Sequence, residues 1–282
     1  FRPYVTMFQN MQIFETKDRN REGFSKVWLR LRLLKSAQSK TFRESSGLIC
    51  LSEYARNYLT QYHSGIISKI PVQMIAHGTD ISTMSTHCHS REDSDNPKLL
   101  RILYVSTVKK YKHQWNLIDA VGMLSREGAA IELHLIGGGD THALRLMKEA
   151  LQRNDPERSY IFYHGKLPQE ETLAWYYKAD MFVFPSTCEN LPVILLEAMT
   201  AGLPIASSDR GPMPEVLKDA GLYFNPDSIL SIKSCLRYMI DNSELRQRLG
   251  KKAKQYSQGY SWKKCAIETF SFLRSVYDRS KA

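Results

Sequence analysis

The sequence has no apolar run of the roughly 18 residues that a membrane-spanning helix needs. It has five cysteines in 282 residues, and no two of them have the spacing of a metal site. Scattered thiols in odd number are typical of a reduced compartment, so we expect a cytoplasmic protein with mostly buried cysteines. His87-Cys88-His89 has no second ligand pair nearby and is interpreted as a solvated loop. The absence of Gly-Lys-Ser and Gly-Lys-Thr excludes a P-loop.

The first residues lack an initiator methionine and a charged leader segment, and residues 1–8 read as the interior of a domain. We therefore expect the natural protein to extend further upstream. Short apolar runs predict strands at 4–8, 47–51 and 72–75. Ser52 is a suitable N-cap for a helix over 53–62. Residues 1–82 are thus interpreted as the remnant of an α/β domain.

Net positive charge is the main deviation in composition, at +10 for the whole chain. Such a charge indicates anionic partners, among them phosphates, anionic lipid and nucleic acid. Nine of the basic residues lie between residues 17 and 43, against two acids, together with Trp28 and four leucines. A basic helix with an apolar face can lie on a membrane surface, but an ordinary helix with a solvated charged face explains the pattern too. No nucleic-acid-binding module is recognised, so we expect no nucleic-acid partner.

A polar segment over residues 83–98, with Pro97 near its end, is the best linker candidate. Strands and helices then alternate through 99–261, which predicts a parallel sheet with right-handed crossovers. The expected strands are 99–106, 131–136, 160–163, 181–184 and 204–207, and the helices between and after them are 114–126, 141–153, 169–178, 192–201, 228–241 and 244–255. A last helix over 262–277 belongs to a final segment, 262–282.

Three loops that follow strands of this sheet are rich in lysine or glycine. Ligands of open parallel sheets bind outside the carboxyl ends of the strands, where these loops begin. Lys109, Lys110 and Lys112 follow the first strand and can neutralise a diphosphate, although most lysine-rich turns are only exposed turns. The second loop, residues 137–140, has three glycines that permit close approach of a ligand, but it is not the dinucleotide fingerprint. The third loop, residues 164–168, also carries a glycine at a strand end.

The fourth loop places two acids around a helix start. Glu189 precedes the expected helix and Glu197 lies inside it, so we expect them about two turns apart on one side of that helix. The positive N-terminus of a helix also favours anionic ligand groups. Glu197 follows an apolar run, where a carboxylate needs hydrogen-bond donors. Sugar hydroxyls are such donors, and so are a lysine or the local backbone.

These residues resemble a known family. Pro185-Ser186, Glu189, Glu197-Ala-Met-Thr-Ala-Gly202 and Pro204 match the Glu-x7-Glu pattern of family-4 retaining glycosyltransferases of the GT-B fold. Four further elements follow the family's order, and they are Ser52…Leu59, Ala76-His-Gly-Thr-Asp80, Lys112…Leu117-Ile-Asp-Ala120 and Arg210-Gly-Pro-Met-Pro-Glu215. The resemblance implies a complete C-terminal Rossmann-like domain and part of an N-terminal one.

The resemblance also implies roles for the segments and residues. Residues 1–82 would belong to the acceptor-binding domain, 99–261 to the donor-binding domain, and the helix of 262–282 would cross back to the former. Glu189 and Lys112 would be catalytic, on the donor sugar and the leaving diphosphate. Glu197 would bind the ribose hydroxyls, and the remaining donor-binding residues would be Thr107, Lys109, Gly138, Gly165, Lys166, Leu167, Asn190 and Leu191.

The sequence departs from the family pattern at three places. Thr107 stands where the family often has an arginine, so Lys109 or Lys110 would supply the cation. Asn190-Leu191 replaces the usual Gly-Phe, and a side chain at 190 would narrow the sugar pocket. The acceptor-domain histidine is not evident, since Gln9 or Asn10 occupies its neighbourhood, and we assign no general base.

The implied reaction moves a sugar from a nucleoside-diphosphate sugar to a hydroxyl of a glycan or lipid-linked acceptor, with retention. Lysines and a helix N-terminus can stabilise the leaving phosphate, and the resemblance implies that neither a metal nor a cofactor is needed. The expected location is the cytoplasm, with peripheral contact to the inner face of a membrane left open. Two alternatives are a nucleotide-sugar epimerase of similar architecture and a non-catalytic sugar-nucleotide-binding protein.

Overall fold

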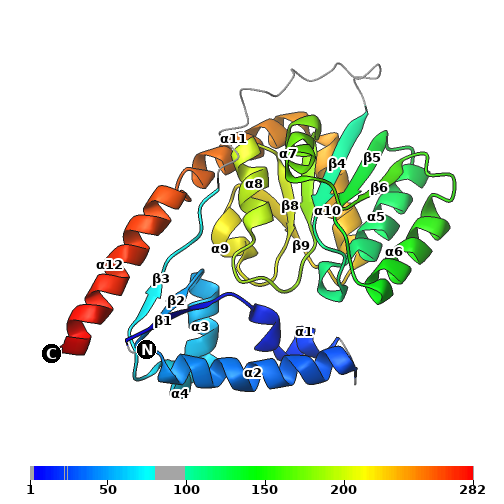
Figure 1. Cartoon of the computed structure of the whole chain (residues 1–282). Coiled ribbons are helices and arrows are strands. Elements are labelled where there is room, and N and C mark those ends of the chain that lie inside the picture. Colours follow the sequence, from blue (N-terminus) through cyan, green and yellow to red (C-terminus); the bar gives the residue numbers. More distant parts are fainter. Residues whose placement is uncertain (1–2, 22, 24, 80–98, 282) are drawn as a thin grey trace. The chain divides into compact units, whose positions relative to one another are not determined.

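The computed structural model describes residues 3–21, 23, 25–79 and 99–281. The chain forms two compact units, each with its own sheet (Figure 1). Unit 1 comprises Phe1–Thr79, Cys188–Val193 and Tyr260–Ala282, and unit 2 comprises Asp80–Thr187 and Ile194–Gly259. The predicted linker over 83–98 and the His87-Cys88-His89 sequence lie outside the described residues.

Unit 2 is built on a six-stranded sheet whose described strand pairs are all parallel, in the order β6-β5-β4-β7-β8-β9. The strands are β4 (Leu100–Val105), β5 (Ile131–Ile136), β6 (Ile161–Gly165), β7 (Met181–Phe184), β8 (Ile205–Ser208) and β9 (Gly221–Phe224). The central strand β7 is buried along its whole length, as a sheet covered on both faces requires. The predicted α/β class with a parallel sheet is therefore confirmed.

Helices connect and cover these strands (Figure 1). They are α5 (Gln114–Arg126), α6 (Thr141–Asn154), α7 (Gln169–Lys178), α8 (Val193–Ala201), α9 (Met213–Leu217), α10 (Ile229–Asp241) and α11 (Ser243–Ser257). Side-chain caps define two of the starts, because Asp140 accepts from the backbone N–H of Ala143 and Ser228 from that of Ser231. The sequence did not predict α9 and β9, which are short elements of five and four residues.

Unit 1 contains a three-stranded parallel sheet in the order β1-β2-β3, formed by β1 (Val5–Phe8), β2 (Gly47–Cys50) and β3 (Val72–Met74). The last helix, α12 (Trp262–Lys281), packs on this sheet. Ile49 and Ile75 form a buried cluster with Phe272 and Val276 of α12. A Cβ on Gly47 would lie 3.0 Å from both of these α12 side chains, so the absence of a side chain there allows the close packing.

The basic segment of unit 1 folds into helices. It contains most of α1 (Thr16–Asn20) and of α2 (Lys26–Glu44). The short 3-10 helix η1 (Met11–Ile13) precedes it, and α3 (Glu53–Tyr62) and α4 (Ser64–Ile67) follow. Leu31 and Phe42 of α2 are buried, whereas Leu29 and Leu33 are 55% and 65% exposed. The apolar residues of α2 thus do not form a single core face. None of the described helices is long and apolar enough to cross a membrane.

A histidine stack in unit 2 makes stability depend on pH. His134 of β5 lies with its ring centroid 4.3 Å from that of Trp175, and its Nδ1 is 3.1 Å from Nε2 of His164. Burial lowers the pKa of His134 from its ordinary 6.5 to about 4, although a hydrogen bond with Glu132 opposes the shift. Between these pH values the unfolded chain therefore binds more protons than the folded chain. The free energy of unfolding falls as the pH is lowered through this window.

We expect His134→Asn to flatten the fall in unfolding free energy between pH 6.5 and about 4. The measurement is urea unfolding followed by tryptophan fluorescence at a series of pH values. His142→Asn, at an exposed position on α6, is the control and should keep the wild-type slope. An unchanged slope in His134→Asn would show that this histidine does not control the pH dependence.

Candidate functional site

Unit 2 has a pocket of about 540 Å³ at the carboxyl ends of β4, β5 and β6. It is lined by Val105, Ser106, Thr107, Lys109, Ile136, Gly137, Gly138, Gly139, Asp140, Lys166, Leu167, Thr172 and Ile194. Five of the residues singled out in the sequence are among them, namely Thr107, Lys109, Gly138, Lys166 and Leu167. Gly165 adjoins the pocket, since its carbonyl accepts from the N–H of Gly137 at 2.7 Å. The volume lies in the range of small-molecule sites.

The loops after β4 and β5 touch each other at the floor of this pocket. Val108 pairs with Gly139 in an isolated parallel bridge, and its N–H donates to the carbonyl of Gly138 at 2.8 Å. A Cβ on Gly137 would lie 2.1 Å from the carbonyl oxygen of Ser106, and Gly137 also has a φ of 137°. A Cβ on Gly139 would lie 2.4 Å from that of Val108. Glycine at 137 and 139 is therefore required by loop packing.

Gly138 differs from its two neighbours because it has room for a side chain. The nearest atom to a Cβ built there is Cβ of Lys166, at 3.7 Å, which is an ordinary contact distance. Since both residues line the pocket, a methyl group at 138 would occupy pocket volume and would not disturb the loops.

The glycines allow a paired test. Gly139→Ala should lower the free energy of unfolding by about 2 kcal/mol, because backbone or Val108 has to move. Gly138→Ala should change it by less than about 0.5 kcal/mol and should weaken the nucleotide binding that the sequence resemblance implies for this pocket. Urea unfolding and calorimetric titration with UDP, GDP and ADP measure the two effects. A comparable loss of stability in both variants would contradict the packing argument.

Lys112 lies in a short 3-10 helix, η3 (Lys110–Lys112), and is 4% exposed. Its carbonyl accepts from the hydroxyl of Tyr104 at 2.9 Å, which holds the backbone in place. Its Nζ lies 5.3 Å from the ring centroids of both Tyr111 and Phe184, at distances where a cation is attracted to an aromatic face. Lys112 is not one of the described residues that line the pocket, whose cations are Lys109 and Lys166.

Glu197 lies on α8, one helical turn after the pocket residue Ile194. Its Oε2 accepts from the hydroxyl of Tyr176 at 2.7 Å, and Tyr176 itself follows the pocket residue Thr172 by one turn of α7. Burial raises the pKa of Glu197, and the hydrogen bond from Tyr176 opposes that shift. The partner of this half-buried carboxylate is therefore a tyrosine, an option that the sequence reasoning did not include.

Glu189, Asn190 and Leu191 lie in the Cys188–Val193 segment of unit 1. As predicted, Glu189 precedes helix α8 and Glu197 lies inside it. The helix begins only at Val193, four residues after Glu189, so helical geometry does not set the expected two-turn spacing between the two acids. The amide of Asn190 donates to the carbonyl of Phe8 at 2.7 Å, and its own carbonyl accepts from the hydroxyl of Ser52 at 2.7 Å. These bonds attach the segment to the sheet and to the start of α3.

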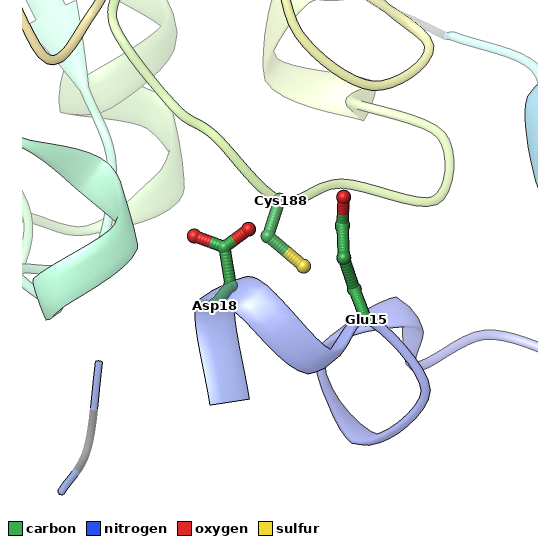
Figure 2. A group of neighbouring side chains, drawn as sticks. All are labelled: Glu15, Asp18 and Cys188. Carbon is green, nitrogen blue, oxygen red and sulfur yellow. The ribbon is translucent and has the colours of Figure 1, made fainter. Parts of the chain in front are cut away.

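A second cluster of reactive side chains joins the same segment to α1 (Figure 2). Potential ligand atoms of Glu15, Asp18 and Cys188 lie within 4.8 Å of one another. The hydroxyl of Tyr54 donates to Glu15 at 2.8 Å, and Asp18 pairs with Arg21 at 2.9 Å. Burial raises the pKa of Glu15 and raises that of the Cys188 thiol well above its usual value, which opposes the thiolate that a metal site needs. We interpret the cluster as a hydrogen-bonded support for the segment.

Other residues of the pocket region were missed by the sequence reasoning. Tyr176 and Thr172 lie on the correctly predicted helix α7. The packing of α7 decides that Tyr176 contacts Glu197 of α8 and that Thr172 lines the pocket. Gln114, which donates to the carbonyl of Thr107 at 3.2 Å, is a third such residue. The sequence offered one indication that Gln114 lies near the pocket, because this residue begins a helix directly after the lysine-rich loop.

Comparison with known proteins gives a family match. The model of the family described as glycosyl transferases group 1 matches residues 89–256, which is more than half of the chain. This range contains the whole pocket of unit 2.

Curated relatives and solved structures agree with that match. The chain is 26% identical over 169 residues to O-antigen chain mannosyltransferase B of Escherichia coli, covering 60% of this chain and 44% of that protein. It is 35% identical over 125 residues to the amylovoran biosynthesis glycosyltransferase AmsK of Erwinia amylovora, covering 42% and 30%. Anabaena HepE in complex with UDP-glucose has a TM-score of 0.77 at 18% identity, covering 97% and 72%. The chain thus spans less than half the length of these two curated relatives.

Proposed function

Because the chain belongs to the glycosyl transferases group 1 family and has a GT-B-type fold, we propose that it is a retaining, family-4 member that uses a nucleoside-diphosphate sugar. The observation that carries this proposal is the pocket of unit 2. It combines glycine-lined backbone, two lysines and the N-terminus of α6 at the carboxyl ends of three parallel strands. Such an edge is where open parallel sheets bind nucleotides.

The pocket suits the nucleoside diphosphate of the donor. Lys109 and Lys166 offer positive charge to the diphosphate, and Gly138 with Thr107 offers close backbone approach. Gly165, Lys166 and Leu167 would contact the base through their backbone groups. Glu197 would accept hydrogen bonds from the ribose hydroxyls, in an orientation fixed by Tyr176. The ribose hydroxyls would stabilise the half-buried carboxylate of Glu197 in addition to Tyr176, which supports nucleotide binding in this pocket.

Lys112 is proposed to stabilise the leaving diphosphate. The bond between the anomeric carbon and the diphosphate oxygen breaks, and negative charge grows on the leaving group as the sugar gains oxocarbenium character. A cation positioned before the reaction lowers the barrier without reorganising during it. The rings of Tyr111 and Phe184 and the hydrogen bond from Tyr104 restrict Lys112 in that way.

Further roles are proposed for the Cys188–Val193 segment. Glu189 would hydrogen-bond the donor sugar, and the backbone of Asn190 and Leu191 would face the sugar or the phosphates. The bonds from Asn190 to Phe8 and from Ser52 to Asn190 would hold that backbone in place. The acceptor oxygen then bonds to the anomeric carbon on the face from which the diphosphate leaves, and the proton of the acceptor hydroxyl passes to an oxygen of the leaving diphosphate. We propose no metal and no cofactor for this reaction, since lysines provide the positive charge.

The names of the relatives support a glycan or a lipid-linked glycan as acceptor. The E. coli relative is an O-antigen chain mannosyltransferase, and the E. amylovora relative acts in amylovoran biosynthesis. HepE was solved with UDP-glucose. We propose a role in polysaccharide biosynthesis on that basis, and the family match disfavours the epimerase alternative.

Glu197→Gln should weaken UDP binding by roughly tenfold, because it removes the charge that ribose hydroxyls bond to. Tyr176→Phe should weaken it less, since it deletes only the group that orients the carboxylate. Titration calorimetry with UDP, GDP and ADP checks both values, and Glu244→Gln on α11 is an exposed control in the same unit. If Glu197→Gln bound every nucleotide as the control does, Glu197 would not be a ribose ligand.

Activity is tested on the full-length protein with a panel of labelled sugar nucleotides and membrane or glycan acceptors. Lys112→Met keeps the packed stem but deletes the charge, so kcat should fall by a factor of about 100 while UDP affinity changes less. Lys148→Ala on α6 is the exposed control. NMR of the product should show the anomeric configuration of the donor. Binding without turnover would favour the non-catalytic alternative, and inversion would refute the retaining assignment.

A further inference from the structure

Unit 1 contains a basic pocket of about 700 Å³ that plays no part in the proposed reaction. It is lined by Arg19, Arg32, Lys35, Ser36, Ser39, Arg43, His63 and Gly65. None of these described lining residues is acidic, and five of them can carry positive charge. All of them belong to unit 1, whereas the pocket proposed for the donor belongs to unit 2.

Helix α2 provides most of the pocket. Lys35 and Ser36 follow Arg32 by three and four residues, and Ser39 and Arg43 continue at the same spacing. These five residues therefore lie on one face of the helix. Ser39 of this face is buried, so the pocket reaches down to the body of the unit. Charged side chains of one sign on one helix face repel each other, and such a face is destabilising without a compensating anion.

The guanidinium of Arg19 is held in place before any ligand arrives. Its Nη1 donates to the carbonyl of Ile13 at 3.0 Å and its Nη2 to the hydroxyl of Thr16 at 3.4 Å. Its Nε is buried and has no hydrogen-bond partner among the described residues. A buried donor without a partner is costly, so a ligand oxygen that reached Nε would stabilise the folded protein.

The electrostatics of the pocket are unbalanced. Burial lowers the pKa of Lys35, and the charge of Arg19 lowers it further. Burial also lowers the pKa of His63, with further contributions from Lys35 and Arg19. The neighbouring acid Asp18 is paired with Arg21, and Glu15 is bonded to Tyr54. Glu44, which directly follows Arg43, lies 3.9 Å from Lys40. None of these three acids is among the described residues that line the pocket.

We infer that this pocket binds a phosphate group carried by a ligand, with Arg19, Arg32 and Arg43 as its hydrogen-bonding cations. Two N–H groups of one guanidinium match the spacing of two phosphate oxygens, so an arginine can form two parallel hydrogen bonds to a phosphate. The ligand is either a soluble phosphate ester or the phosphate of a lipid. Leu29 and Leu33, which are exposed on α2 next to the basic face, would contact the chains of a lipid.

The test uses the full-length protein and two variants that remove equal charge from α2. Arg32→Gln with Arg43→Gln alters the exposed side of the pocket, and Arg30→Gln with Lys40→Gln alters exposed positions that do not line it. Inorganic pyrophosphate is titrated by calorimetry at low and high salt. The pocket variant should lose roughly tenfold in affinity at low salt, and the control variant less than about twofold.

Vesicles distinguish the two sources of phosphate. Sedimentation with phosphatidylcholine vesicles, with and without phosphatidic acid, is repeated for both variants and for Leu33→Ser. Loss of binding to phosphatidic acid in the pocket variant and in Leu33→Ser indicates a lipid phosphate. Loss of pyrophosphate binding alone indicates a soluble ester. If neither probe separates the pocket variant from the control variant, the inference is wrong.

The result is independent of the proposed glycosyl transfer. UDP binding is measured in parallel and should be the same in both α2 variants, because neither changes a residue of the unit 2 pocket. A failure of the proposed function would appear as absent turnover or absent UDP binding in the wild type, and it would leave the pyrophosphate comparison intact.

Discussion

The close contact between the loops after β4 and β5 is the constraint on which the proposed donor site depends. The bridge between Val108 and Gly139 brings Lys109, Gly138 and the capped start of α6 to one pocket. A side chain at 139 would collide with Val108, so glycine is the residue that permits the contact. Gly137 and Gly139 are thus needed for the packing of the two loops. The same loop geometry leaves Gly138 exposed to the pocket.

Aromatic rings and positive charge are combined differently in the two units. In unit 2, Lys112 is buried against Tyr111 and Phe184, which stabilises a cation away from bulk water. In unit 1, Lys35 lies 5.9 Å from the ring of Phe14, and Lys35 and other basic residues line the same pocket. The aromatic rings stabilise the charge of Lys112 within the protein. The basic pocket of unit 1 has no such compensation among its described lining residues, in line with the inferred binding of a phosphate.

The segment Cys188–Val193 belongs to unit 1, but in the sequence it lies between Thr187 and Ile194 of unit 2. It carries Glu189 and is attached within unit 1 by the bonds of Asn190 and by the Glu15–Cys188 cluster. Immediately after it, α8 carries Glu197 in unit 2. The residues proposed to act on the donor sugar and on the nucleotide thus lie close together in the sequence, although they belong to different units.

Periodicity in the sequence alone determined most of the alternating strands and helices of residues 99–261, because this signal is local, but it missed the short elements α9 and β9. The bounds of Gln114–Arg126 and Gln169–Lys178 are identical to the prediction. The lysine and glycine loops could also be placed, since they follow predicted strands. Only the tertiary structure decided that Tyr176 bonds Glu197, that Lys112 is buried on two rings and that Arg19 meets the basic face of α2. Apart from the contact of Lys112 with its neighbour Tyr111, these contacts join different elements, and packing, not local preference, selects which side chains meet.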